Sequence, residues 1–253
     1  MGKKVKEQAP DEYLLIVPVG DIISLIRIYM AQKTGLCVIT DDYKVNFDEK
    51  LAQEALEYLM KLYENGVLVP FEETVATPEV TESMLWQNSK CGMMISPSSA
   101  FSNVLKNSNF EIGHTSIPIF KDAKDTAVEI RPAQIMSIYA KSKHITETAK
   151  FLNWLLGSVE AIEILKDTRG VPANTVTKKY LEEKKIYDPI IADITNEAIK
   201  IAGKPPSDLS FNSEIEKIFE DVIGMVAYKK ITPAEGAKLL VEQITEKVNE
   251  LKD

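Results

Sequence analysis

Cysteine and histidine are scarce in this sequence, and their scarcity removes several classes of function. The 253 residues include two cysteines, Cys37 and Cys91, and two histidines, His114 and His144. Two cysteines cannot build a disulfide framework, and neither lies in a CxxC or Cys/His spacing that holds zinc. Neither histidine lies beside a nucleophile motif. We therefore expect no bound metal, and we expect both cysteines to be small buried residues.

Motifs for cofactor binding and catalysis are also missing. The sequence has no GxGxxG after a predicted strand, no GxxxxGK[ST], no HExxH and no GxSxG. The acidic pairs at 41–42 and 72–73 could supply acid–base chemistry, but their context predicts exposed loops with solvated carboxylates. The sequence therefore predicts no catalytic residue, no cofactor and no enzyme.

The sequence also has fewer positive than negative charges and no long uninterrupted apolar run. A net charge of -8 opposes binding to a phosphate backbone, so nucleic acid is a poor partner. The first eight residues are charged and contain no apolar core, so we expect no export signal in this chain. The most apolar run, 13–30, contains Pro18, Gly20, Asp21 and Arg27, which argues against a membrane span. With 45% hydrophobic and 27% charged residues, the sequence predicts a soluble globular protein of one or two domains.

Short apolar segments alternate with amphipathic ones, which is the pattern of an α/β lobe. Asp21 can cap one helix and Gly35 can end it, and Thr232, Pro233 and Glu235 can start the last helix through a capping box. We predict strands at 13–17, 92–96 and 133–140, and an extended segment at 111–117. We predict helices at 22–33, from 48 until Gly66, from 77 through 86, and at 98–106, 146–156, 158–166, 174–184, 188–202, 212–228 and 232–251.

Three stretches resemble one family of binding proteins. The first is LWQNSKCGMMISPSSAF at 85–101, and the second is AKSK at 140–143 with AKFLNWL at 149–155 and GVPAN at 170–174. The third is ITPAEGA at 231–237. Together they are similar to the C-terminal part of the family 1 extracellular solute-binding proteins, the maltose-binding-protein-like family.

This resemblance implies a periplasmic-binding-protein fold of type II, an α/β fold with two lobes. Residues 1–118 and 171–253 would form the C-terminal lobe, and 119–170 would cross a hinge to complete the N-terminal lobe. A complete family member also has a signal and a stretch that builds most of the first lobe, so we expect this chain to be truncated. The strand at 133–140 and the face with Phe151, Trp154 and Leu155 would then lack packing partners, which predicts self-association.

The resemblance also implies a function. Such proteins are the substrate-binding components of ABC importers, and they bind a sugar or similar small polar solute in a cleft between two lobes and deliver it to a permease. The complete protein would be extracytoplasmic, either periplasmic or anchored as a lipoprotein. Alternatives that stay open are an anionic solute such as a uronate or sugar phosphate, and a ligand-sensing or interaction module on the same fold.

Several residues are candidates for ligand contacts, and each has a simpler alternative. Asp21 could accept hydrogen bonds from sugar hydroxyls or only cap a helix. Phe101 could stack on a sugar ring or belong to the core. Arg131 could bind a carboxylate or phosphate through two hydrogen bonds, or it could be an ordinary surface residue. The remaining candidates are the small polar residues of the turn after the second strand and two residues before the penultimate helix: Ser96, Ser98, Ser99, Phe211 and Asn212.

Overall fold

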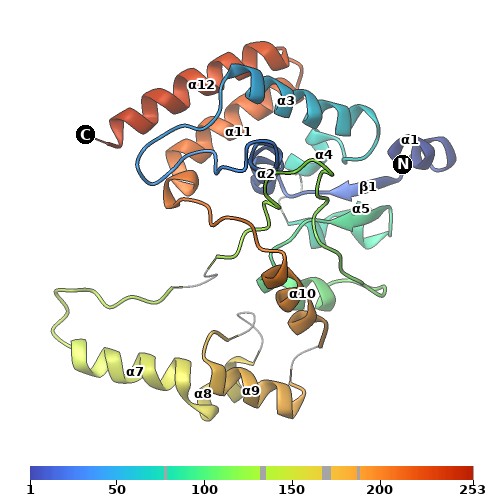
Figure 1. Ribbon diagram of the computed structural model, residues 1–253. Coiled ribbons are helices and arrows are strands. Elements are labelled where there is room, and N and C mark those ends of the chain that lie inside the picture. Colours follow the sequence, from blue (N-terminus) through green and yellow to red (C-terminus); the bar gives the residue numbers. More distant parts are fainter. Residues whose placement is uncertain (77–78, 132–134, 167–171, 187–188, 253) are drawn as a thin grey trace. The chain divides into compact units, whose positions relative to one another are not determined.

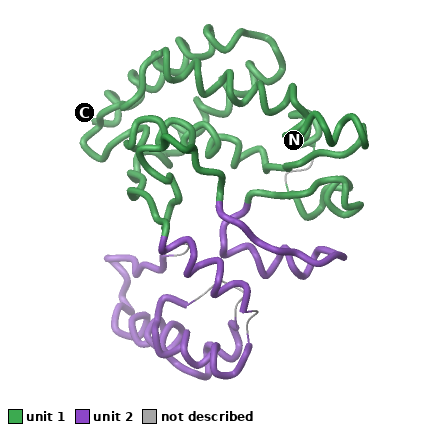
Figure 2. Tube along the Cα trace, turned by 45° about the vertical axis from the view of Figure 1, so that its right-hand side comes forward, with its two compact units in different colours: residues 1–95, 117–130, 201–253 green, residues 96–116, 131–200 purple. Residues whose placement is uncertain are grey.

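The computed structural model describes residues 1–76, 79–131, 135–166, 172–186 and 189–252. The chain forms two compact units, and each is built from separate pieces of sequence (Figure 2). Unit 1 contains residues 1–95, 117–130 and 201–253, and unit 2 contains residues 96–116 and 131–200. These units are compact groups within this chain; the predicted assignment of 1–118, 119–170 and 171–253 to lobes of a complete protein stays a prediction.

Unit 1 is a helical layer on a small parallel sheet. Strands β1 (Tyr13–Ile16) and β2 (Cys91–Met94) pair in parallel, with Leu15 opposite Met93. Leu15 also forms a parallel bridge with Leu68, so β1 lies between β2 and the segment around Leu68. The other elements of unit 1 are α1 (Gly2–Gln8), η1 (Val19–Asp21), α2 (Ile22–Thr34), α3 (Glu49–Glu64), α4 (Phe71–Ala76), η2 (Val80–Glu82), α5 (Met84–Gln87), η4 (Asp208–Phe211), α11 (Ser213–Ala227) and α12 (Pro233–Glu250).

The core of unit 1 joins the beginning of the chain to its end. Helices α2 and α3 pack with α11 and α12, and Figure 1 shows α3, α11 and α12 lying together although about 150 residues separate α3 from α11. Ile26, Leu56, Phe219 and Leu240 are among the fully buried side chains at this junction. Unit 1 therefore depends on apolar faces from separate stretches of sequence.

Local capping chemistry sets several helix ends as predicted. The Asp48 side chain accepts a hydrogen bond from the Leu51 backbone N–H at the start of α3. Gly35 ends α2 with φ 74°, in the left-handed region where glycine is favoured. Thr232 and Glu235 form the capping box of α12, with Pro233 in its first turn. The predicted glycine stops after α2 and α3 and the predicted start of α12 are confirmed. The predicted cap of α2 by Asp21 is wrong, because Asp21 has a helical backbone conformation and its side chain makes no capping hydrogen bond.

Unit 2 is helical around a smaller core. Its elements are η3 (Ser98–Ala100), α6 (Phe101–Lys106), α7 (Ile145–Gly157), α8 (Val159–Leu165), α9 (Thr175–Lys184) and α10 (Pro189–Lys200). Phe101, Ile162, Leu181 and Ile191 form the buried cluster. All residues of α7 are described, and none of them is buried.

Three sequence predictions for local structure are wrong. Residues 135–140 form no strand; 133 and 134 lie outside the described residues. A strand needs a neighbour for its backbone N–H and C=O groups, and this segment pairs with no strand in the part of the chain that is described. Residues 111–117, predicted only as an extended segment, form neither helix nor strand. The acidic pair at 72–73, predicted to lie in an exposed loop, lies instead in the first turn of α4. The single helix predicted from 77 through 86 is replaced by η2 and α5; Thr77 and Pro78 lie outside the described residues.

Candidate ligand-binding site

The carboxyl ends of the parallel segments in unit 1 lie at one edge of the sheet. After β1 the chain runs through Pro18 into η1, and after Leu68 it runs through Pro70 into α4. Open α/β sheets bind their ligands outside this edge, because loops there are free to carry polar groups. The turn of η1 is therefore the first place in unit 1 to look for ligand contacts.

Asp21 lies at this edge, as predicted. It is half-buried and holds the N-cap position of α2, where its side chain makes no capping hydrogen bond. The neighbouring Gly20 is exposed, and a Cβ placed on it would meet no atom within 4 Å. The surface beside Asp21 is thus open enough for another molecule to approach.

The candidates in unit 2 follow β2 in the sequence. Ser96 and Ser98 are exposed and Ser99 is half-buried, so three hydroxyl groups lie in one short turn around η3. Phe101 is only 9% exposed and packs with Ile162 in the core of unit 2. This burial favours its packing alternative, because a stacking platform needs an open ring face.

Arg131 is the basic candidate for an anionic ligand. Its side chain is exposed, in the connection between unit 1 and α7. A guanidinium can bind a carboxylate through two parallel hydrogen bonds, which is the chemistry that makes Arg131 a candidate.

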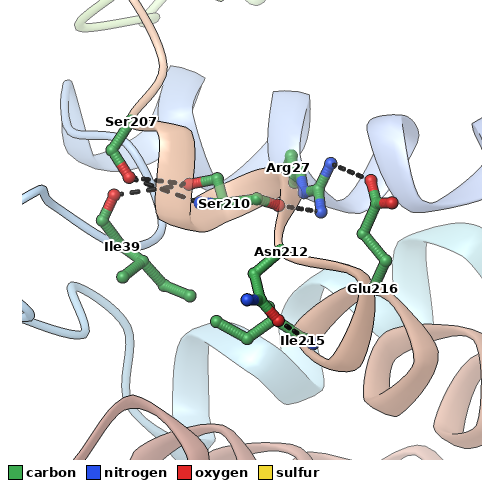
Figure 3. A network of polar contacts seen from close by, with 7 residues as sticks. All are labelled: Arg27, Ile39, Ser207, Ser210, Asn212, Ile215 and Glu216. Atoms are coloured by element: carbon green, nitrogen blue, oxygen red, sulfur yellow. Dashed lines mark hydrogen bonds and ion pairs between the residues drawn. The ribbon is translucent and has the colours of Figure 1, made fainter. Parts of the chain in front are cut away.

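Phe211 and Asn212 are half-buried beside a polar network that the sequence did not reveal. Figure 3 shows this network, with Asn212 among its labelled residues. Arg27 of α2 is buried, donates to the carbonyl oxygen of Ser210, and reaches the Glu216 carboxylate at 3.4 Å. Its guanidinium carbon lies 4.8 Å from the centroid of the Phe211 ring. Arg27 therefore ties η4 and α11 to α2.

Ser210 and Asn212 complete the polar contacts at this point. The Ser210 hydroxyl donates to the Ile39 carbonyl oxygen at 3.3 Å. The Asn212 side-chain oxygen accepts from the backbone N–H groups of Glu214 and Ile215, which makes Asn212 the N-cap of α11. Phe211 and Asn212 thus have structural roles, and their predicted ligand contacts stay a prediction.

A small space lies beside this network. It is lined in part by Arg27, Cys37, Asp125 and Lys204, and its volume is about 30 Å³. A space of this size holds about one water molecule, so it is too small for a sugar. Asp125 is occupied in holding the chain, because its carboxylate accepts from the backbone N–H groups of Ala127 and Lys204.

The cysteines and His114, which the sequence offered as reactive side chains, have no arrangement in the described part of the structure that indicates catalysis. Both cysteines are free; Cys91 is buried, and burial raises the pKa of its thiol to about 11, so it is protonated at neutral pH. Cys37, predicted to be buried, is only half-buried. His114 lies 3.6 Å from the Glu197 carboxylate in an irregular segment of unit 2.

Among the described residues, no group of three or more His, Cys, Asp or Glu side chains is arranged to hold a metal ion. Within the same ranges, none of the helices combines the length and the apolar character that crossing a bilayer requires.

Comparison with known proteins gives the family. The model of the bacterial extracellular solute-binding protein family matches residues 27–161, which is more than half of the chain. A periplasmic oligogalacturonide binding protein from Yersinia enterocolitica, solved with saturated digalacturonic acid, superposes with a TM-score of 0.90 at 24% identity. The match covers 100% of this chain and 65% of that one.

Two further structures share the fold. A periplasmic solute binding protein from Pectobacterium atrosepticum has a TM-score of 0.88 and 22% identity, over 100% of this chain and 65% of that one. A de novo designed esterase has a TM-score of 0.84 and 24% identity, over 100% of this chain and 64% of that one. The chain therefore spans about 65% of the length of these structures. The predicted fold class and family are confirmed: this chain belongs to the bacterial extracellular solute-binding proteins.

Proposed function

We propose that this chain is the larger part of the substrate-binding component of an ABC importer, and that its solute is an acidic carbohydrate such as a uronate. One observation carries the choice of solute: the whole chain superposes with a TM-score of 0.90 on a protein that binds digalacturonic acid. Family membership supports the role in solute binding, the extracytoplasmic location and the ABC permease as partner.

The described side chains suit a carboxylate-bearing sugar. Arg131 is an exposed residue whose guanidinium can pair with a sugar carboxylate, and the hydroxyl groups of Ser98 and Ser99 can exchange hydrogen bonds with sugar hydroxyls. Asp21, at the edge of the sheet in unit 1, can accept hydrogen bonds from sugar hydroxyls. A neutral sugar, the other candidate solute, would lack the carboxylate that pairs with the charge of Arg131.

Calorimetric titration of the chain with digalacturonate and with a neutral galactose disaccharide tests the solute class. We expect digalacturonate to bind more tightly, and Arg131→Gln to weaken its binding by about tenfold, because the variant loses a charge-assisted pair of hydrogen bonds. Lys143→Gln is the matched control, since it removes an exposed positive charge from the same unit.

Two results would count against this solute. If Arg131→Gln and Lys143→Gln weaken binding equally, Arg131 makes no specific contact with the solute carboxylate. The two variants then act only through the loss of one positive charge. If the neutral disaccharide binds as tightly as digalacturonate, the solute is a neutral sugar. If neither solute produces heat of binding on titration, the proposal is overturned for this chain.

We also propose that a second copy of this chain associates through the apolar side of unit 2. Phe151 and Leu156 on α7 are exposed, and Ile135 and Tyr139 in the segment before it are 80% and 71% exposed. The Phe151 and Trp154 rings lie 5.9 Å apart on the same helix, which enlarges the apolar patch. Patches of this kind drive association of proteins in water.

Light scattering over a range of concentrations tests this association. We expect the average mass of the unaltered chain to rise with concentration, and Phe151→Glu to bring it back to the monomer, because a carboxylate cannot be buried against apolar side chains without cost. Glu147→Gln changes the charge of the same helix without altering any apolar side chain and serves as control. A constant monomer mass for the unaltered chain would rule the association out.

A further inference from the structure

Asn65 and Gly66 form the single Asn-Gly pair of the sequence, at the turn that follows α3. Asparagine is chemically labile, and most so before glycine, whose missing Cβ leaves the backbone nitrogen open to the asparagine side chain. In the reaction this nitrogen bonds to the side-chain carbonyl carbon, and the amide nitrogen leaves as ammonia with the proton of the N–H group. Water then opens the resulting succinimide ring to aspartate or isoaspartate. The pair therefore holds the most reactive amide of the unfolded chain.

The end of α3 holds both reacting groups away from this reaction. The Asn65 Nδ2 donates to the Lys61 carbonyl oxygen at 2.7 Å, and the Gly66 N–H donates to the Tyr63 carbonyl oxygen at 3.0 Å. Asn65 has ψ 6°, which places the Gly66 nitrogen on the side of the Asn65 backbone nitrogen. Ring closure needs the Gly66 nitrogen on the side of the Asn65 Cβ instead. The turn must therefore rotate before the reaction can start.

Helix α1 lies over this turn and restrains it. Gly2 is buried against the turn, because a Cβ on Gly2 would overlap the Asn65 carbonyl oxygen and would lie 2.8 Å from the Val67 nitrogen. The stem of Lys6 covers Gly66: a Cβ placed on Gly66 would overlap the Lys6 Cγ and would lie 3.1 Å from the Lys6 Cε. These close approaches leave no room for the turn to rotate while α1 stays in place.

The Lys6 side chain is itself fixed. Its Nζ donates to the Pro10 carbonyl oxygen at 2.6 Å and lies 3.2 Å from the centroid of the Tyr13 ring in β1. Lys6 thus anchors α1 to the segment and the strand that follow it. Loss of this side chain should loosen α1 and uncover Gly66 at the same time.

We propose that α1 is a cover over a labile modification site, and that Asn65 deamidates only when α1 lifts from the turn. The product carries a carboxylate where the amide donated to the Lys61 carbonyl oxygen, so two oxygens face each other at the negative end of α3. The change would lie close to Leu68, which bridges to Leu15 in β1. The proposal does not depend on the solute that the chain binds.

Peptide mapping by mass spectrometry, during incubation at mildly alkaline pH and well below the unfolding temperature, tests the cover. We expect Asn65 of the folded chain to deamidate at least about tenfold more slowly than in the free peptide LYENGVLV of residues 62–69, which has no cover. Lys6→Ala should raise the rate in the folded chain at least about fivefold, because the open turn becomes more populated. Gly2→Val should also raise the rate, since a Cβ at this position overlaps the turn.

Lys4→Ala is the matched control, because it removes an exposed lysine from the same helix and should leave the rate at Asn65 unchanged. Asn88 and Asn107, each followed by serine, report on unfolding of the whole chain, which would speed all three sites together. Equal rates at Asn65 in the folded chain and in the peptide would overturn the proposal. So would an unchanged rate in both Lys6→Ala and Gly2→Val, or a parallel rise at all three asparagines.

Discussion

Gln32→Glu is expected to lower the free energy of unfolding by about 3–5 kcal/mol at pH 7, although it exchanges an amide for a group of the same shape. The Gln32 side chain is 0% exposed. Its Nε2 donates to the carbonyl oxygens of Pro118 and Thr126 at 3.0 and 3.1 Å, and its Oε1 accepts from the Phe120 N–H at 3.0 Å. All three bonds hold the segment 117–130 against α2, and a carboxylate would turn two of them into contacts between oxygens.

The loss of stability in Gln32→Glu should be smaller at low pH than at neutral pH. In the folded Gln32→Glu variant, burial and the two facing carbonyl oxygens would raise the pKa of the introduced carboxyl group above the ordinary value of about 4.3. The folded state then holds a proton that the unfolded state has released, so the stability of the variant relative to the original chain falls as pH rises through this interval. Urea unfolding at pH 4.5 and at pH 7 should show the smaller deficit at pH 4.5.

Gln8→Glu provides the matched control for this change. Gln8 is exposed at the end of α1, so the same substitution there should alter stability by no more than about 0.5 kcal/mol. Equal losses at Gln8 and Gln32, or a deficit at Gln32 that grows on acidification, would contradict the role of the Gln32 side chain as a clamp.

Arg27→Met should destabilise unit 1 by about 2–4 kcal/mol, measured by urea unfolding. Methionine can fill the apolar part of the space but leaves the buried Ser210 carbonyl oxygen without its donor and ends the contact with the Phe211 ring. The stability of Arg27→Lys should fall between those of the original chain and Arg27→Met, because lysine keeps the charge and loses the planar fork that serves two acceptors at once.

Lys33→Met is the control on the same helix. Lys33 pairs with Asp122 at 3.2 Å on the surface, where an ion pair contributes little to stability, so its loss should be barely measurable. If Arg27→Met unfolds at the same urea concentration as Lys33→Met, the network around Arg27 is not what holds η4 to α2.

The sequence predicted those parts of the fold whose cause is local. The capping box at Thr232 and the glycine at position 35 act on atoms within a few residues, so their chemistry is visible in the sequence. The Asp48 cap is equally local but was not predicted. The helices after residue 145 were predicted to within a few residues for the same reason. Strand 133–140 failed because pairing is decided by a distant partner, which periodicity does not reveal.

The polar network was missed because its partners are far apart in the chain. Arg27 binds a carbonyl oxygen 183 residues away, and Gln32 binds one 94 residues away. One signal was available: both residues lie on the otherwise apolar side of α2, where a polar side chain must find a partner or destabilise the fold. That pattern indicates a buried polar contact, but it gives no means of naming the acceptor.

Because unit 1 is divided among separate stretches of sequence, its core can be completed only after the last of these stretches has been synthesised. Helices α2 and α3 leave the ribosome before α11 and α12, which cover them, are translated. During synthesis the apolar faces of α2 and α3 therefore stay uncovered until the segments between α3 and α11, including all of unit 2, have been made. Exposed apolar faces of this kind favour aggregation, so we expect substitutions that weaken the packing of α12 to lower the yield of folded protein as well as its stability.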